Sequence, residues 1–168
     1  AEQLKGGTVA ISRFGSATDT IARFALRKIG LNPGKDVTLI QVGSGPERLS
    51  AALTGRVSAS VINPPSSFIA EKKGLAIIAD VAQMGLVFQH TGAATTRKYI
   101  KEHPDTVRRY VRSHMEAVHK MWTDKEATIK ALSRYMGSGL DRETLERSYE
   151  NVMTEAFYPK KQYPSLEG

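Results

Sequence analysis

The sequence contains no cysteine and a single tryptophan among its 168 residues. Without cysteine, the chain has no disulfide bond, no thiol nucleophile and no thiolate ligand for zinc or an iron–sulfur cluster. Long apolar runs are also missing, because glycine, proline or charged residues interrupt each stretch before the roughly 20 residues of a membrane span. The opening AEQLKGG lacks the basic and apolar regions of a signal peptide, so we expect any export signal to have been removed already.

Acidic residues are the scarcer charged class, with 17 Asp and Glu against 24 Lys and Arg and a net charge of +7. The excess is spread evenly: residues 1–84 hold 10 basic and 6 acidic residues, and residues 85–168 hold 14 and 11. Basic side chains interleaved with acidic ones are typical of a solvated surface, whereas nucleic-acid sites concentrate them in patches. We therefore expect no nucleic-acid partner and only a general attraction to anions.

The first half of the chain alternates β-like runs with amphipathic helical patterns. Apolar, β-branched runs predict strands over residues 8–12, 37–42, 57–62 and 76–79. Helical spacing, bounded by glycine or proline, predicts helices over residues 17–29, 46–53 and 67–73. Strands and helices that alternate with short connections indicate an open α/β fold with a mostly parallel sheet.

The second half has a different character, with extended segments over residues 85–96 and helices from residue 97 onward. A boundary is predicted at His103-Pro104, because the residue before proline avoids the helical region and proline suits a helix start. The helix after Pro104 carries an apolar stripe formed by Val107, Tyr110, Val111, Met115, Val118 and Trp122. Further predictions are helices over 126–136 and 142–157 and an extended tail over 158–168. Since the small sheet offers little cover for this stripe, we expect self-association through these helices or partial disorder beyond residue 96.

The polar loop over residues 12–19 (SRFGSATD) is the most informative candidate site. It lies where a predicted strand gives way to a helix, and ligands of open α/β sheets bind outside the carboxyl ends of the strands. Ser16 is a candidate N-cap, the N–H groups of Ala17 and Thr18 would be free, and Gly15 would let a ligand approach the backbone. Further donors are the hydroxyl groups of Ser12, Ser16 and Thr18. This pattern favours an anion or polar head group bound on backbone amides, although an ordinary capped helix is a slightly better explanation on these residues alone.

Two other predicted strand ends lead to the same edge of the sheet. Gly43 and Gly45 resemble part of a phosphate-binding loop, but the Lys-Ser/Thr pair of that loop is absent, so ordinary turn chemistry is favoured. Asn63 stands before Pro64-Pro65, which stiffen the chain and orient the Asn side chain. Ligand contact and a plain turn are equally good interpretations of Asn63.

Residues for catalysis or metal binding do not form a recognisable pattern. The histidines His90, His103, His114 and His119 have neither metal-ligand spacing nor a carboxylate partner, and packing or solvated roles are favoured. No catalytic triad or nucleophile elbow occurs, and Asp19 is better explained by the helix dipole than as a base. The residues thus predict a binding module without metal, cofactor or enzymatic activity.

Several segments in order resemble the substrate-binding proteins of bacterial ABC importers, in the branch with nitrate-, sulfonate-, taurine- and thiamine-precursor-binding members. The resemblance rests on LKGGTVAI (4–11), GSATD (15–19), GLNPGKDV (30–37), RLSAALTGRV (48–57) and TRKYIKEHPD (96–105). It implies a periplasmic protein with a type II periplasmic-binding fold, whose two lobes close over a small anionic or polar solute and deliver it to a membrane permease served by ATPase subunits.

The resemblance also implies the organisation of the chain and its ligand contacts. Residues 5–90 would be the second α/β lobe, and residues 91–168 the hinge return and C-terminal helices of a first lobe that is otherwise absent. The chain would then be a C-terminal fragment, with residues 86–95 returning through the hinge as a strand. The implied ligand contacts are Ser12, Phe14, Gly15, Ser16, Ala17, Thr18, Gly43 and Asn63. Arg13 joins them as a partner for a carboxylate or sulfonate, with a solvated surface role equally open.

Two alternatives share the architecture. An enzyme related to the thiamine-pyrimidine synthases would need lysine and histidine chemistry that no residues here match. An effector-sensing domain of a transcription regulator is the other, and the LKGG opening and helical second half fit the importer branch better. The Ser12-Arg13-Phe14 lead-in departs from the small polar residues of the family, which leaves the ligand class open.

Overall fold

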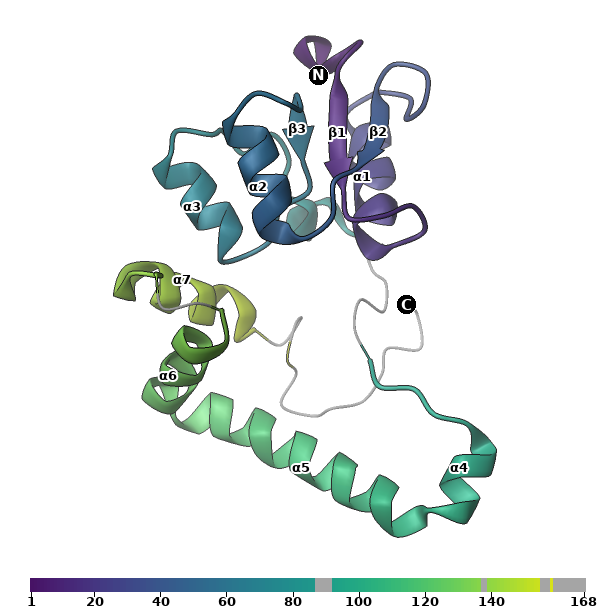
Figure 1. The fold of residues 1–168 in the computed structure, drawn as a ribbon, viewed down its shortest axis with the longest axis vertical. Coiled ribbons are helices and arrows are strands. Elements are labelled where there is room, and N and C mark those ends of the chain that lie inside the picture. The colour runs from purple at the N-terminus through teal and green to yellow at the C-terminus, as the bar shows by residue number, and fades with distance from the viewer. Residues whose placement is uncertain (87–91, 137–138, 155–157, 159–168) are drawn as a thin grey trace. The chain divides into compact units, whose positions relative to one another are not determined.

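The computed structural model describes residues 1–86, 92–136, 139–154 and 158, and the chain divides into two compact units, residues 1–87 and 88–168 (Figure 1). The helices and strands of the first unit are η1 (Glu2–Leu4), β1 (Thr8–Ile11), α1 (Ala17–Lys28), β2 (Thr38–Gln41), α2 (Gly45–Leu53), β3 (Ala59–Ser60), α3 (Ser66–Lys72) and η2 (Val81–Met84). Those described in the second unit are α4 (Arg97–Glu102), α5 (Pro104–Thr123), α6 (Lys125–Met136) and α7 (Arg142–Val152).

A parallel three-stranded sheet in the order β2-β1-β3 organises the first unit. In the register, Val9 of β1 lies opposite Leu39 of β2 and Ala59 of β3. The chain passes from β1 to β2 through α1 and from β2 to β3 through α2, because parallel strands cannot be joined by a tight turn. The predicted α/β fold with a mostly parallel sheet is therefore confirmed.

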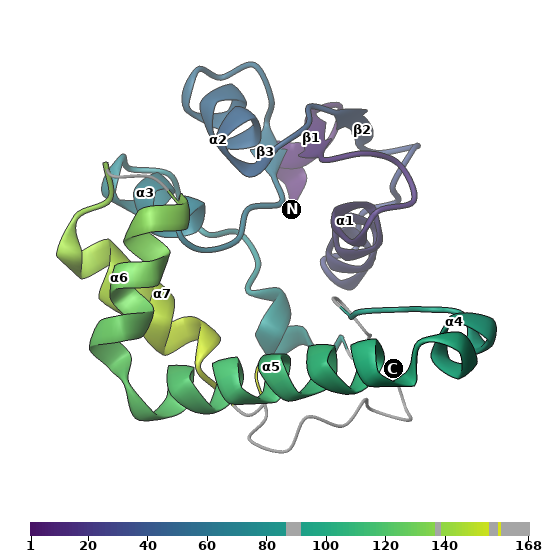
Figure 2. The same ribbon diagram turned by 60° about the horizontal axis from the view of Figure 1, so that its bottom comes forward.

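Side chains of β1 alternate between two cores, one on each face of the sheet. Val9 and Ile11 pack in a cluster with Ala22 and Leu26 of α1, while Ala10 packs with Ala51 of α2. Figure 2 shows α1 and α2 on opposite sides of the strands. Because both faces of β1 are covered, its run is apolar throughout rather than alternating.

The fourth strand, predicted over residues 76–79, is wrong. After Gly74, which ends α3, the described residues 75–80 contain no strand. Ile77 and Ile78 remain 60% and 52% exposed, so their β-branched side chains have no packed surface to stabilise an added strand. β3 is also shorter than the predicted 57–62, although the bonds Ser58 N–H to Thr8 O and Val61 N–H to Ala10 O extend its alignment with β1.

Helix starts in the second unit follow the predicted positions closely. α4 ends before His103 and α5 begins at Pro104, which confirms the boundary there. The predicted helix over 142–157 begins at Arg142 but ends at Val152, where the N–H of Thr154 turns back to the Val152 carbonyl. Residues 155–157 and most of the predicted tail lie outside the described residues.

The apolar stripe of α5 is buried only toward its C-terminal end. Val118 is 3% exposed and Trp122 donates its indole N–H to the Tyr158 carbonyl at 3.0 Å, whereas Tyr110 and Met115 are more than half exposed. Self-association through this stripe stays a prediction. Of the extended segments predicted over 85–96, residues 87–91 lie outside the described residues and residues 92–96 form no strand. Within the described part of the chain, no helix has the length and apolarity required to cross a membrane.

Candidate functional site

The carboxyl ends of all three strands lie at one edge of the sheet, because the strands are parallel. Each strand leads through a short loop into a helix, so the N-termini of α1, α2 and α3 follow this same edge. The loops after β2 and β3 are tied to β1 by bonds from Val42 N–H to Ile11 O (2.9 Å) and from Val61 N–H to Ala10 O (3.2 Å). The structure thus brings together the three loops in which candidate residues were predicted.

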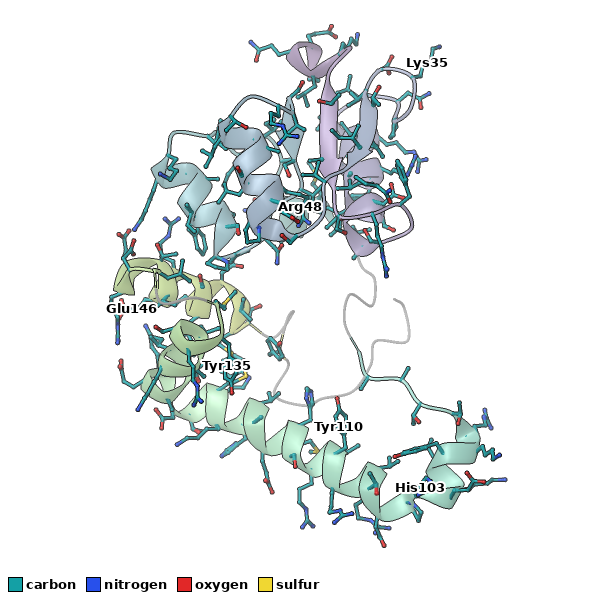
Figure 3. The ribbon with its side chains drawn as sticks, in the orientation of Figure 1. Lys35, Arg48, His103, Tyr110, Tyr135 and Glu146 are labelled. Atoms are coloured by element: carbon teal, nitrogen blue, oxygen red, sulfur yellow. The ribbon has the colours of Figure 1, made fainter. Side chains whose placement is uncertain are left out.

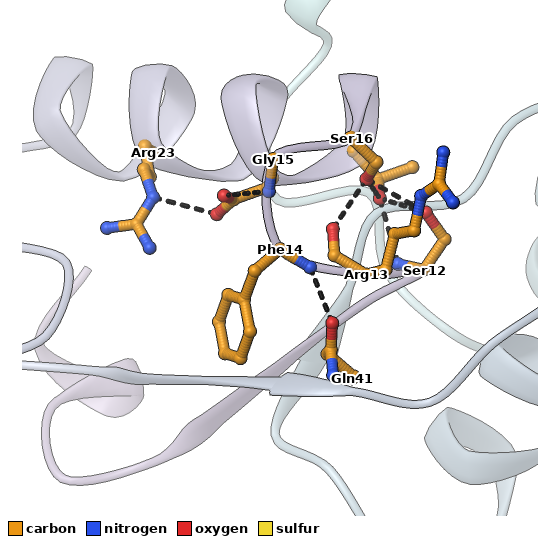
Figure 4. Close-up of polar contacts among 9 residues, drawn as sticks. Ser12, Arg13, Phe14, Gly15, Ser16, Arg23 and Gln41 are labelled. Carbon is orange, nitrogen blue, oxygen red and sulfur yellow. Dashed lines mark hydrogen bonds and ion pairs between the residues drawn. The ribbon is translucent and has the colours of Figure 1, made fainter.

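A cluster of hydroxyl groups forms the centre of the loop after β1 (Figure 4). The Oγ atoms of Ser12 and Ser16 lie 2.9 Å apart, and each lies within 2.9 Å of Thr18 Oγ1. Ser16 Oγ donates to the Arg13 carbonyl at 2.7 Å, which uses the one proton of that hydroxyl. The three contacts within the hydroxyl cluster are therefore served by two protons, those of Ser12 and Thr18, and either proton can be donated to a ligand oxygen in place of a contact in the cluster.

Backbone N–H groups before α1 are partly occupied by side chains. Phe14 N–H donates to Gln41 Oε1 at 2.7 Å, and Gly15 N–H donates to Asp19 Oδ2 at 2.9 Å. Asp19 is held in turn by Arg23 Nε at 2.7 Å, so this loop is anchored from both sides. Glycine is required at position 15 because its φ is +74°.

The first turn of α1 leaves donors available. Among the residues that the structure describes, the N–H groups of Ala17 and Thr18 donate no hydrogen bond. Ser16 occupies the N-cap position as predicted, but its hydroxyl makes no capping bond, because the hydroxyl cluster and the Arg13 carbonyl engage it instead. Together with the positive end of the helix dipole, these free N–H groups are suited to an anion.

The remaining side chains of this loop are exposed. Phe14 is 53% exposed, and no ion pair of Arg13 occurs in the described part of the chain. In Figure 4 the Phe14 ring and the Arg13 guanidinium extend to opposite sides of the loop. Both side chains are therefore free to contact a ligand.

Gly43 is explained by the turn it forms. Its φ is +103°, and a Cβ at this position would lie 2.4 Å from Glu47 Oε2. That carboxylate accepts the Ser44 N–H at 2.6 Å in a capping box that begins α2. The hydrogen bonds from Ser44 lower the pKa of Glu47 below its ordinary value. Ordinary turn chemistry, the favoured interpretation, thus accounts for the residue type, and ligand contact at Gly43 stays a prediction.

Asn63 follows β3 and is exposed. Its carbonyl accepts the Ser67 N–H at the start of α3, while its side chain has no hydrogen-bond partner within the described ranges. Both interpretations of Asn63 therefore remain open.

Arg48 is a residue of this edge that sequence reasoning missed. It belongs to α2 and is only 4% exposed, with Nε donating to the Val61 carbonyl at 3.0 Å and Nη1 to the Gly43 carbonyl at 2.5 Å. Burial lowers the pKa of its guanidinium. No signal in the sequence distinguishes such an arginine from a surface residue, because one charged residue in an amphipathic helix is ordinarily solvated.

Two surface grooves lie away from these loops, one lined by residues of α6 and α7 and one along α1 beside Leu86. Neither contains a predicted ligand contact. In the described residues, no group of three or more His, Asp or Glu side chains could hold a metal ion. Among the described residues, the loops at the carboxyl edge thus hold the predicted contacts and the free N–H groups of the first turn of α1.

Comparisons with known proteins agree on one class. A model of the NMT1-like family matches residues 1–137. An ABC transporter periplasmic binding protein of Brachyspira hyodysenteriae is 23% identical over 171 aligned positions, which cover 99% of this chain and 47% of that protein. The solved structure of an alkanesulfonate-binding protein from Xanthomonas axonopodis pv. citri, bound to MOPS, matches with a TM-score of 0.70 and 25% identity, over 88% of this chain and 49% of that one. The chain spans about half the length of these relatives.

Proposed function

The chain belongs to the NMT1-like family, and we propose that it forms the second lobe and C-terminal helices of a solute-binding protein of an ABC importer. In this proposal residues 5–90 are the α/β lobe and residues 91–168 belong to the hinge return and the other lobe. The protein acts outside the cytoplasmic membrane, passes its solute to a permease powered by ATPase subunits, and catalyses no reaction. Both relatives described above are binding proteins, which supports this assignment.

The observation that carries the proposal is the open first turn of α1 at the carboxyl edge of the sheet. Two free N–H groups, at Ala17 and Thr18, lie next to a hydroxyl cluster in which Ser12 and Thr18 each have a proton that can be donated to a ligand. A group with several oxygen atoms and a negative charge satisfies both features, because amides and hydroxyls donate to the same anion.

We propose a small organic anion, with a sulfonate as the first candidate, as the solute. The neighbouring structure is that of an alkanesulfonate-binding protein with MOPS bound. A sulfonate presents three oxygens, which match the N–H groups of the first turn, the Ser12 and Thr18 hydroxyls, and the guanidinium of Arg13. The exposed ring of Phe14 supplies apolar surface for the carbon chain of the solute.

In this proposal the two lobes of the whole protein close over the ligand. The loops of this lobe form one wall of the site, so a ligand that also contacts the opposite lobe binds the closed form better than the open one. It therefore shifts the population toward closure. No cofactor is needed, because recognition and release depend on hydrogen bonds and charge alone.

The proposal is tested by titrating the chain with MOPS while recording backbone amide NMR shifts. We expect the largest shifts at the amides of Ala17 and Thr18, with Kd in the millimolar range because the loops of this lobe supply one wall of the proposed site. The same morpholine with an alcohol in place of the sulfonate is the ligand control and should give no such shifts.

Variants identify the groups that bind. Thr18→Val removes a hydroxyl of the cluster at nearly constant volume and should weaken MOPS binding several-fold, whereas Ser50→Ala, an exposed position on α2, should leave it unchanged. Absence of shifts at the first turn of α1, or equal shifts with the neutral analogue, would overturn the proposed function.

A further inference from the structure

Arg48 is a charged side chain buried at the edge of the sheet where the proposed ligand binds. Arg48 is 4% exposed, and Figure 3 shows it beside the end of β1. In the part of the chain that the structure describes, no carboxylate pairs with its guanidinium. Burial of a charge without a partner of opposite sign is strongly unfavourable. The hydrogen bonds to the Val61 and Gly43 carbonyls therefore offset part of the cost of burying this guanidinium.

The partners of Arg48 are backbone carbonyls from two separate loops. Gly43 lies in the loop after β2, and Val61 begins the loop after β3. These strands are not neighbours, because β1 lies between them in the sheet. The guanidinium therefore joins the two outer loops across the end of the central strand.

The hydrogen bonds of the sheet end just before the Gly43 and Val61 carbonyls. Val42 N–H to Ile11 O and Val61 N–H to Ala10 O are the ladder-type bonds that tie each loop back to β1. Beyond them, the Gly43 and Val61 carbonyls face the Nη1 and Nε donors of one planar group, whose spacing is fixed. A lysine ammonium is a point donor on a flexible stem and does not impose such a spacing.

We propose that Arg48 is a positioning residue that sets the separation between the loop of Gly43 and the loop of Asn63, on either side of the hydroxyl cluster. It acts on the ligand through these loops and does not touch it. The inference rests on the proposed function for its effect on binding, while its effect on the loops is independent of any ligand.

Hydrogen exchange measured without ligand tests whether Arg48 holds the two loops in place. In the wild-type chain we expect a slowly exchanging Arg48 Nε–H, since that proton is buried and bonded to a carbonyl. Arg48→Lys keeps the charge and most of the volume, and should accelerate amide exchange at Val42 and Val61 by at least about tenfold through local opening. Leu31→Ala is the control: this core residue packs near the C-terminal end of α1, and its loss should accelerate exchange across the whole unit instead.

Binding supplies the second readout. Arg48→Lys should weaken MOPS binding by about tenfold, equivalent to about 1.4 kcal/mol, although its melting temperature falls less than that of Leu31→Ala. Leu31→Ala should keep the wild-type affinity at temperatures where it is folded. This split separates positioning from a general loss of stability.

The outcomes are distinguishable. A rapidly exchanging Arg48 Nε–H in the wild type, or uniform acceleration in Arg48→Lys, would overturn the inference. If Arg48→Lys binds MOPS with wild-type affinity, the inferred effect of Arg48 on ligand binding is overturned. If MOPS does not bind even the wild-type chain, the proposed function fails, and the exchange data alone decide the role of Arg48.

Discussion

Two helices begin at the same edge of the sheet, and their first turns are built differently. In α2 the carboxylate of the third helical residue, Glu47, reaches back to the N–H of the N-cap residue Ser44. In α1 the corresponding carboxylate, Asp19, reaches one residue further, to Gly15. The second helical position is Pro46 in α2, which has no N–H, and Thr18 in α1, whose N–H is free.

This difference separates a helix start that serves the fold from one that is available to a ligand. The capping box and Pro46 leave α2 few donors to offer, and the turn before it needs Gly43 to make room for Glu47. The start of α1 instead commits its serine hydroxyl to the hydroxyl cluster and leaves N–H groups open. Helix starts in one sheet therefore differ in function according to which of their donors are already bonded.

The largest effect is expected from a pair of glycine substitutions. Gly43→Ala should destabilise the unit by about 2–3 kcal/mol, because a left-handed alanine is strained and its Cβ displaces Glu47 from Ser44. Gly15→Ala meets no atom within 4 Å and should cost only about 1–2 kcal/mol for the left-handed conformation. Urea unfolding with unchanged m-values measures both. Equal losses would show that the capping box of α2 contributes nothing beyond backbone strain.

A smaller effect is expected from the two carboxylates. Asp19→Ala removes the acceptor of both Gly15 N–H and Arg23 Nε from a largely buried site, and should cost about 2 kcal/mol. Glu47→Ala removes an exposed cap and should cost about 1 kcal/mol or less. Thermal unfolding of both variants at neutral pH checks the order, and a larger loss in Glu47→Ala would contradict it.

The smallest effect is a dependence of stability on pH at α2. Ser44 lowers the pKa of Glu47 from its ordinary value of 4.5, so the charged form is favoured in the folded chain. The stabilisation is complete above pH 4.5 and is lost as the pH falls through the folded-state pKa. As the pH falls through that acid range, the melting temperature of the wild type should therefore decrease more than that of Glu47→Gln. From pH 6 to 7 the difference between the two melting temperatures should stay constant. Parallel curves throughout would exclude a contribution of Glu47 to acid sensitivity.

Local features of the fold were predictable where a residue's own backbone preference decides. Gly30 follows α1 with φ of +83°, and the Leu31 N–H donates to the Leu26 carbonyl, as is typical when glycine ends a helix. Pro104 begins α5 because its fixed φ suits the first helical position, where its missing N–H is not needed. The run at 76–79 failed as a strand because β propensity depends on a neighbouring strand and a covered face, neither of which is present for the exposed Ile77 and Ile78.

The sequence alone was enough to establish the α/β class, the helix starts and the polar loop at residues 12–19, since these follow from periodicity, turn residues and local hydrogen-bonding capacity. Folding in three dimensions was needed for the rest. It turned the Ser16 hydroxyl from a cap into a member of the hydroxyl cluster, and it buried Arg48 between carbonyls 5 and 13 residues away in the chain. Which of several possible partners a polar group takes depends on what the tertiary fold brings within about 3 Å of it, and no residue pattern along the chain contains that distance.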